Sequence, residues 1–341
     1  MNQKPFDLHK GMTFGFYARN GYYSSPEARR EVDKMAALNI EWICLVVIVM
    51  QDTFASTKQY RDFKMTPADD EVREIIDYIH SKGIKVQLRP MLECWDGTQR
   101  IHVTFPEERT IMPGKPINHW TRWFESMNER TWHYASLATR AGCEAYGLDS
   151  ELDLTSNQHA HWKTVVATAR SVYKGHLTTG HTPIVHILDD LKKYPDHWFH
   201  QLDSLGTSFY TPVADKPGAT FEEMQEKLKE PLEYFRQIAA IYKKPFYFAE
   251  CGCCSSAGAT MLPYFWGGEG GYDGDEQARF LDAVLTTFWK EPWWMGMYWW
   301  KWDEQNYRPE FKVDPRGDKG FTIDGKPAAE VMKRWYGRKD R

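Results

Sequence analysis

Short apolar segments alternate with helical patterns along the whole chain, and this alternation restricts the possible folds more than any other feature. Residues 42–50 (WICLVVIVM) are apolar throughout, and residues 244–250 form an aromatic-rich run that ends in a carboxylate. Strands of this kind suit a parallel sheet, in which both faces are covered. Eight of them alternating with helices favour a single (β/α)8 TIM barrel, of α/β class, over an open doubly wound sheet. No Gly-x-Gly-x-x-Gly follows any strand, so a dinucleotide fold has no support.

The expected elements divide the chain evenly. Strands are predicted at residues 11–16, 42–50, 84–90, 144–151, 176–181, 202–210, 244–250 and 295–300, with 183–188 as an alternative for the fifth. Helices are predicted at residues 26–38, 67–82, 120–141, 159–173, 221–242, 275–289 and 326–335. The polar stretch 91–118 is a long loop, which in a compact domain is usually functional. Because no linker or break in composition is present, we expect one catalytic domain over residues 1–341.

Composition excludes some partners. Aromatic residues make up 15% of the chain and include 15 Trp; such rings stack on sugars but also fill cores, so both interpretations stay open. A net charge of −4 does not indicate binding to nucleic acid or to an anionic membrane. The first residues form no apolar signal segment, and no run is long enough to span a bilayer. A cytoplasmic protein is therefore expected.

The six Cys residues are scattered and do not form a disulfide framework. Cys251, Cys253 and Cys254 are packed too closely for a tetrahedral metal site, and no second pair with zinc-ribbon spacing is present. We therefore expect neither a metal nor an organic cofactor. A metal-dependent hydrolase that uses His159, His161 and these thiols stays as an alternative.

Two glutamates each finish a predicted strand. Glu151 ends the fourth strand and Glu250 ends the seventh. In a (β/α)8 barrel the carboxyl ends of the strands carry the chemistry, and a buried glutamate is costly to desolvate. One such residue alone is better explained as a strand-end ion pair. Two at matching strand ends indicate the carboxylate pair of a glycosidase, which in a retaining enzyme lies about 5–5.5 Å apart.

The chain resembles the clan A glycoside hydrolases, whose acid/base ends strand four and whose nucleophile ends strand seven. Within the clan it most resembles family 113, the β-mannanases. The third strand and its loop are similar to that family's Lys-Pro-His-Val-Asp, Asp-Gly and Trp-Arg, here Arg89-Pro90-Met91-Leu92-Glu93, Asp96-Gly97 and Gln99-Arg100. Further similar segments are His161-Trp162 to Leu177-Thr178, Asp203-Ser204-Leu205-Gly206 with Phe209-Tyr210, and Gly325-Lys326-Pro327-Ala328 with Glu330-Val331 and Trp335.

The resemblance implies roles for individual residues. Glu151 is the acid/base, Glu250 is the nucleophile, and Tyr210 donates a hydrogen bond that keeps Glu250 ionised and oriented. The alternative for Tyr210 is a strand-end aromatic in the core. Burial and the neighbouring carboxylate are expected to raise the pKa of the acid.

Substrate-binding candidates lie at strand ends and on the loop after strand three. Because alternate strand residues face opposite sides, Trp299, Trp300 and Trp302 cannot all line the site; Trp300 is the expected sugar platform, with Trp302 beside it. Asp96 and Arg100 are expected to bind sugar hydroxyls, with an ion pair between them as the alternative. The full set comprises Trp300, Trp302, Trp299, Asp96, Arg100, Arg89, Ser150 and Trp95, the last as the wall of a subsite.

The departures from the family pattern concern sugar contacts. Ser150 stands where the clan has an Asn that binds the sugar 2-hydroxyl, Met91 replaces a His, and Gln99 replaces a Trp. We expect these hydrogen bonds to be lost or re-routed, and we expect residues 255–273 to narrow the cleft towards chain-end substrates. The expected function is retaining hydrolysis of β-mannosidic or related β-linked oligosaccharides or polysaccharides. The alternatives are another clan A β-glycosidase (glucosidase, galactosidase or xylan-acting) and a non-catalytic sugar-binding barrel.

Overall fold

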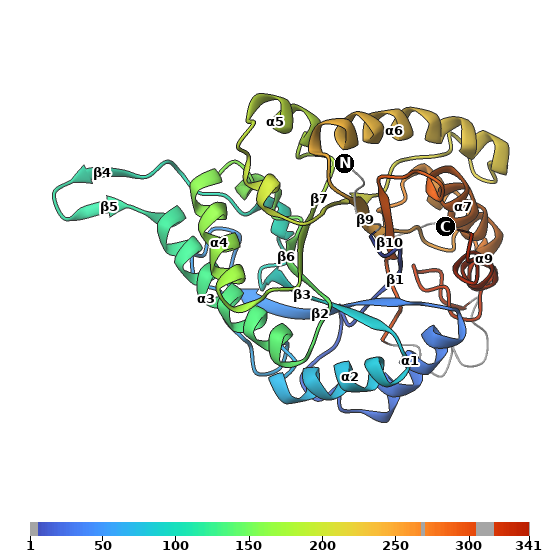
Figure 1. The fold of residues 1–341 in the computed structure, drawn as a ribbon, viewed down its shortest axis with the longest axis horizontal. Helices are drawn as coiled ribbons and strands as arrows, with labels where there is room; N and C mark the ends of the chain where they lie inside the picture. Colours follow the sequence, from blue (N-terminus) through green and yellow to red (C-terminus); the bar gives the residue numbers. More distant parts are fainter. Residues whose placement is uncertain (1–5, 267–269, 305–316, 341) are drawn as a thin grey trace.

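The computed structural model describes residues 6–266, 270–304 and 317–340. Its parallel strands close into a barrel in the order β1-β10-β9-β8-β7-β6-β3-β2 (Figure 1). The barrel strands are β1 (His9–Phe14), β2 (Trp42–Gln51), β3 (Lys85–Cys94), β6 (Ala145–Ser150), β7 (His176–His181), β8 (Leu205–Phe209), β9 (Phe246–Cys251) and β10 (Trp294–Trp299). The predicted (β/α)8 barrel is confirmed.

Helices surround the barrel (Figure 1). They are α1 (Pro26–Ala37), α2 (Asp69–Ser81), α3 (His119–Arg140), α4 (His159–Val172), α5 (Ile187–Lys193), α6 (Phe221–Tyr242), α7 (Gly274–Phe288) and α9 (Pro327–Tyr336). Local signals fix several of their starts: the Ser25 side chain accepts the Ala28 N–H at the start of α1, and Thr220 and Glu223 form a capping box on α6. No helix in the described ranges is both long enough and apolar enough to cross a bilayer.

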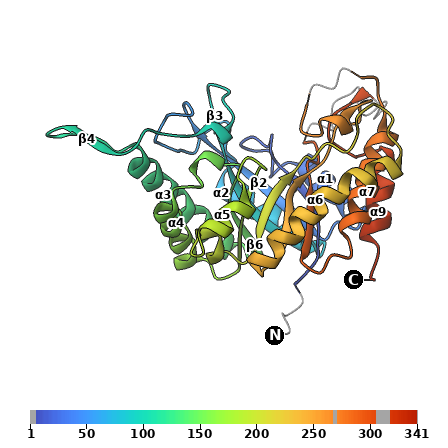
Figure 2. The same cartoon turned by 90° about the horizontal axis from the view of Figure 1, so that it is seen from above.

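The structure differs from the sequence prediction in two segments. Residues 183–188 are not a strand, because Ile187 opens the short helix α5. The stretch 91–118 is less irregular than expected. Strand β3 continues into it as far as Cys94, and it also holds η1 (Arg100–His102) and the antiparallel hairpin of β4 (Arg109–Met112) and β5 (Lys115–Ile117). Figures 1 and 2 both show this hairpin projecting away from the barrel.

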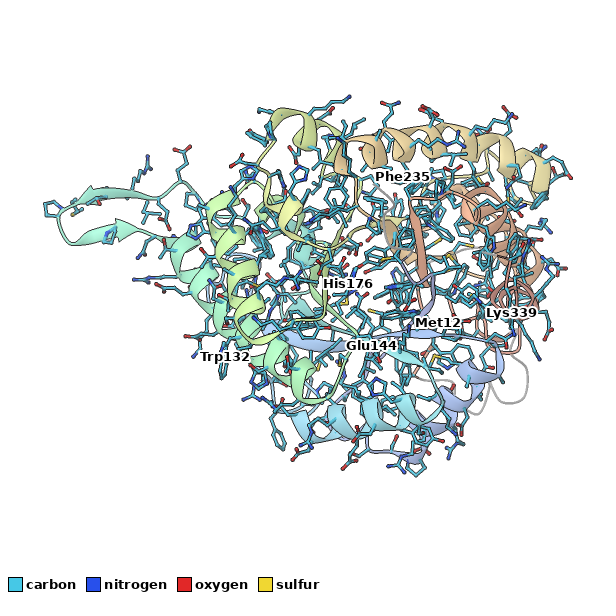
Figure 3. All side chains as sticks on the ribbon, in the orientation of Figure 1. Met12, Trp132, Glu144, His176, Phe235 and Lys339 are labelled. Carbon is cyan, nitrogen blue, oxygen red and sulfur yellow. The ribbon has the colours of Figure 1, made fainter. Side chains whose placement is uncertain are left out.

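Apolar side chains form two layers, one between strands and helices and one inside the barrel. Figure 3 shows side chains filling the space between the strands and the helices. Inside the barrel, small residues make room near the end of β9. A Cβ added to Gly180 or Gly206 would lie only 2.7 or 2.8 Å from the Ala249 Cβ. Ala249 directly precedes Glu250, so the backbone next to this carboxylate is closely packed and leaves no room for a side chain at either glycine.

Candidate active site

Both predicted glutamates lie at the mouth formed by the carboxyl ends of the strands. Glu250 is the penultimate residue of β9, and its partner across the ladder is Ser208 on β8. Glu151 directly follows β6 and has a φ of 61°, in the left-handed region that a residue with a side chain rarely adopts. Its N–H donates to the Gly180 carbonyl oxygen at 2.9 Å, which ties this conformation to strand β7.

Glu250 is almost completely buried and accepts hydrogen bonds from two uncharged hydroxyl groups. The Ser150 hydroxyl donates to Oε1 and the Tyr210 hydroxyl donates to Oε2, each at 3.0 Å. Only 2% of Glu250 is exposed. Burial and, after it, the charge of Glu151 raise the pKa of Glu250 to about 7.

Glu151 is held by a hydroxyl and by a guanidinium. The Ser208 hydroxyl donates to Oε1 at 2.7 Å, and Arg100 Nη2 donates to Oε2 at 2.8 Å. The same Arg100 nitrogen lies 3.8 Å from Glu250 Oε1. The two carboxylate oxygens are therefore no more than about 6.6 Å apart, which suits the 5–5.5 Å spacing of the carboxyl groups in a retaining pair.

Arg100 lies between several acidic groups. In addition to its contacts with the pair, it donates from Nε to the Ser150 carbonyl oxygen at 2.9 Å and from Nη1 to Glu93 Oε1. Its expected alternative partner, Asp96, is exposed and accepts the Thr98 N–H instead. The structure thus brings Arg100 into the site without Asp96.

The three tryptophans after β10 separate into different layers. Trp300 belongs to the interior cluster and lies with its ring centroid 5.0 Å from that of Phe16. Trp299 and Trp302 are completely buried in the outer layer, where their indole N–H groups donate to the Phe321 carbonyl oxygen and to Glu31 of helix α1. The expectation that Trp299 and Trp302 contact substrate is wrong, because neither ring has an exposed face.

Two further expectations are corrected by burial. Arg89 is fully buried inside the barrel and donates to the Ala249 carbonyl oxygen at 3.2 Å, so it lies beneath the carboxylates and out of reach of substrate. The Ser150 side chain is also fully buried, and its hydroxyl is directed to Glu250. It supports the carboxylate instead of taking over the sugar contact of an Asn. Trp95 is half exposed just beyond β3, where a subsite wall remains a proposal.

The comparisons with known proteins agree with this geometry. The family model of Glycoside Hydrolase Family 113 matches residues 12–326. The chain belongs to glycoside hydrolase family 113. It is therefore a glycoside hydrolase of clan A. No curated protein matches the chain.

Solved structures of other family 113 enzymes match this family 113 enzyme over nearly all of its length. A GH113 β-1,4-mannanase in a complex is 28% identical, with 97% of this chain and 100% of that chain covered and a TM-score of 0.81. A GH113 β-mannanase from Alicyclobacillus acidocaldarius is 27% identical, with 97% of each chain covered and a TM-score of 0.82. A family 5 mannosidase from Rhizomucor miehei, 11% identical over 97% of this chain and 92% of its own, shares the fold at a TM-score of 0.59.

Two site residues of the family 113 enzyme were missed from sequence. Ser208 lies two positions before Tyr210, and the period of a strand places both on one face, so the choice of Tyr210 already implied it. Glu93 was seen only as a motif position. It is part-buried against Arg100, and burial raises its pKa. A third carboxyl group thus adjoins the pair.

A metal-dependent hydrolase was the alternative, and it would need a cluster of metal-ligating side chains. Among residues 6–266, 270–304 and 317–340, no group of three or more His, Cys, Asp or Glu is arranged to hold a metal ion. His161 instead stacks on Phe124, with ring centroids 4.6 Å apart. Burial raises the pKa values of Cys251, Cys253 and Cys254, which favours their protonated thiol form.

Proposed function

We propose that this chain is a retaining β-mannanase-type hydrolase in which Glu250 is the nucleophile and Glu151 is the acid/base. The observation that carries the proposal is the pair itself: two carboxyl groups from remote strands, with oxygens within about 6.6 Å of each other, at the open end of the barrel. Ser150 and Tyr210 donate to Glu250 and favour its ionised form. These uncharged donors lie closer to the carboxylate than Arg100 Nη2, which is 3.8 Å from Oε1.

The reaction follows from the positions of the two groups. Glu250 attacks the anomeric carbon while Glu151 gives its proton to the leaving oxygen, and a covalent glycosyl-enzyme forms. Glu151, now a carboxylate, takes a proton from water, which attacks the same carbon and releases Glu250. Two inversions leave the anomeric configuration retained. We assign the sugar platform to Trp300, which belongs to the interior cluster and has 4% of its surface exposed, whereas Trp299 and Trp302 have none.

We propose β-1,4-linked manno-oligosaccharides as the substrate class. Two solved relatives that cover nearly all of the chain, at 27–28% identity, are a β-1,4-mannanase and a β-mannanase by name. The segment 255–273 supplies Trp266, whose ring centroid lies 6.4 Å from that of Trp300 and 6.3 Å from that of Tyr17. These rings form a wall on one side of the sugar platform, which favours short chains and attack near a chain end.

The test assigns each glutamate by chemical rescue. With an activated aryl β-mannoside, E151A plus azide should yield the β-mannosyl azide, because the azide replaces the second attacking water. E250A plus azide should yield the α-mannosyl azide, because the azide replaces the nucleophile itself. Both variants should lose unassisted turnover of mannotetraose by at least about 10³-fold. Glu226, exposed on α6, gives the control E226Q, whose rates should equal those of the parent.

A sugar-binding barrel without catalysis predicts a different outcome. The parent protein would then bind mannotetraose without releasing products, and E250A would bind it equally well. If E151A gave the α-mannosyl azide and E250A the β-mannosyl azide, the roles of the two glutamates would be reversed. If the parent protein inverted the anomeric configuration, the double displacement would be contradicted.

A further inference from the structure

Four aromatic rings gather on one side of the barrel mouth, although they come from remote parts of the chain. They are Phe16 and Tyr17 after β1, Trp266 after β9 and Trp300 after β10. The ring centroid of Phe16 lies 5.0 Å from those of Tyr17 and Trp300. The centroid of Trp266 lies 6.3 Å from that of Tyr17 and 6.4 Å from that of Trp300. Each ring thus packs near two others, and the four form one closed group.

The orientation of Trp266 makes it an end wall for the proposed sugar platform. Its ring is inclined by 87° to that of Trp300, so it stands upright beside the plane of the platform. Half of Trp266 is exposed, whereas Trp300 is nearly buried. A sugar that stacks on Trp300 therefore meets an upright ring on this side.

Contacts with the segment after β10 fix the position of this wall. The Lys326 side chain is completely buried, and its ammonium donates to the Ser255 hydroxyl at 2.9 Å, at the start of the segment that carries Trp266. The Phe321 ring lies 4.8 Å from that of Trp266 and 6.4 Å from that of Tyr210, the phenol that donates to the nucleophile. The wall is thus joined to the groups that hold the nucleophile in place.

The strand order shows which end of a substrate faces the wall. Strands β6 and β10 are separated by three strands in either direction around the barrel, so they lie on opposite sides of it (Figure 1). Glu151 follows β6 and Trp300 follows β10. The proposed acid gives its proton to the leaving oxygen, so the leaving part of the substrate lies on the β6 side. Because C1 and C4 are opposite atoms of a pyranose ring, the 4-hydroxyl of the same sugar is directed to the β10 side.

We propose that Trp266 is a specificity-determining residue that ends the site at the 4-hydroxyl of the sugar on Trp300, so that the enzyme removes single mannose units from the non-reducing end of β-1,4-linked manno-oligosaccharides. Each turnover consumes one water, breaks the terminal glycosidic bond and releases mannose and a chain one unit shorter. The inference rests on the proposed catalytic roles, and it adds which end is attacked and which product leaves.

The first test uses the parent protein and mannohexaose whose reducing end has been reduced to the alditol, so that the two ends differ in mass. The earliest products should be mannose and mannopentaitol. A 4-O-methyl group on the non-reducing sugar should lower kcat/KM by about 100-fold or more, because the methyl group meets the Trp266 ring. This test needs no substitution.

The second test removes the wall. W266A should cut mannohexaitol at internal bonds from the earliest times and should accept the 4-O-methyl substrate as well as the unmethylated one. Its turnover of an aryl β-mannoside should stay within about threefold of the parent, because the catalytic pair is untouched. W266F keeps a ring and should keep mannose as the first product. W132A, at a tryptophan exposed to a similar extent on helix α3, should leave the product pattern unchanged.

Several outcomes would overturn the inference. They are internal cleavage of mannohexaitol by the parent from the earliest times, release of short products that carry the alditol, equal rates on the methylated and unmethylated substrates, and an unchanged product pattern in W266A. Failure of the proposed catalytic roles would be seen separately, as a parent without turnover of the aryl β-mannoside or in the azide products of E151A and E250A.

Discussion

Single residues decide the electrostatics of the site, and Tyr210 shows how much of this the sequence could reveal. The resemblance placed its hydroxyl on Glu250, and the structure has that contact at 3.0 Å. The contacts of Ser150 and Arg100 were not predictable in the same way. A serine in place of an asparagine gave no indication that its hydroxyl turns inwards to Glu250. Arg100 opens the three-residue helix η1, which is too short for periodicity to give a direction, so its position between the carboxyl groups required coordinates.

Removal of the Tyr210 hydroxyl should change both rate and pH dependence. The hydroxyl donates to the ionised form of Glu250, so Y210F should raise the pKa of Glu250 further above its ordinary value. The acidic limb of kcat/KM should move to higher pH, and kcat should fall about 10- to 100-fold. Steady-state rates on mannotetraose from pH 4 to 9 would measure both. Y78F, at a tyrosine that bonds Asp33 on the helical surface, should leave the profile unchanged.

Elements with a long or continuously apolar pattern were predictable from the sequence, whereas short or exposed elements were not. Strand β2 was placed at 42–50 because it is apolar throughout, and helix α6 was placed at 221–242 because its pattern is long. Helix α5 is only seven residues long, too short for its periodicity to be distinguished from an extended run. All four residues of β4 are exposed, so no alternation marks that strand. Trp302 was misplaced because strand β10 ends at Trp299, and the period of two does not continue past that end.

Trp300 and Trp302 both follow the end of β10, and we expect one to affect the kinetics and the other the stability. W300F shortens the proposed sugar platform and should lower kcat/KM by about 10-fold or more with a small change in thermal stability. W302F removes the indole donor of Glu31 in a fully buried place and should cost about 1–3 kcal/mol of unfolding free energy. Kinetics and thermal melts of both variants would measure this. Similar kinetic losses in the two would contradict the separation into layers.

At the scale of the whole molecule, buried histidines should set the acid limit of stability. Burial lowers the pKa of His197 to about 3, and it lowers that of His9 well below the ordinary value. The unfolded chain takes up protons below pH ~6.5 that these folded rings do not accept, so stability is lost as the pH falls through that window. The melting temperature should drop by about 5 °C or more between pH 7 and pH 5.

Substitution of His197 isolates its share of this acid loss. H197Q keeps a side chain that can accept the Phe199 N–H but cannot titrate, so the melting temperature should depend less steeply on pH than in the parent. H186Q, at an exposed histidine, should leave the slope as it is. An unchanged slope in H197Q would show that acid acts through other groups.

The projecting hairpin of β4 and β5 lies in the chain between Arg100 and the two glutamates of the candidate site. A single cut at its tip would leave β1, β2 and β3 on one fragment and β6 to β10 on the other, joined by the β3–β6 and β1–β10 ladders. Glu151 and Glu250 would lie on the long fragment, and Glu93 and Arg100 on the short one. A nicked barrel would thus be a natural complementation system, in which one piece carries both proposed catalytic glutamates and the other carries Arg100, which contacts them.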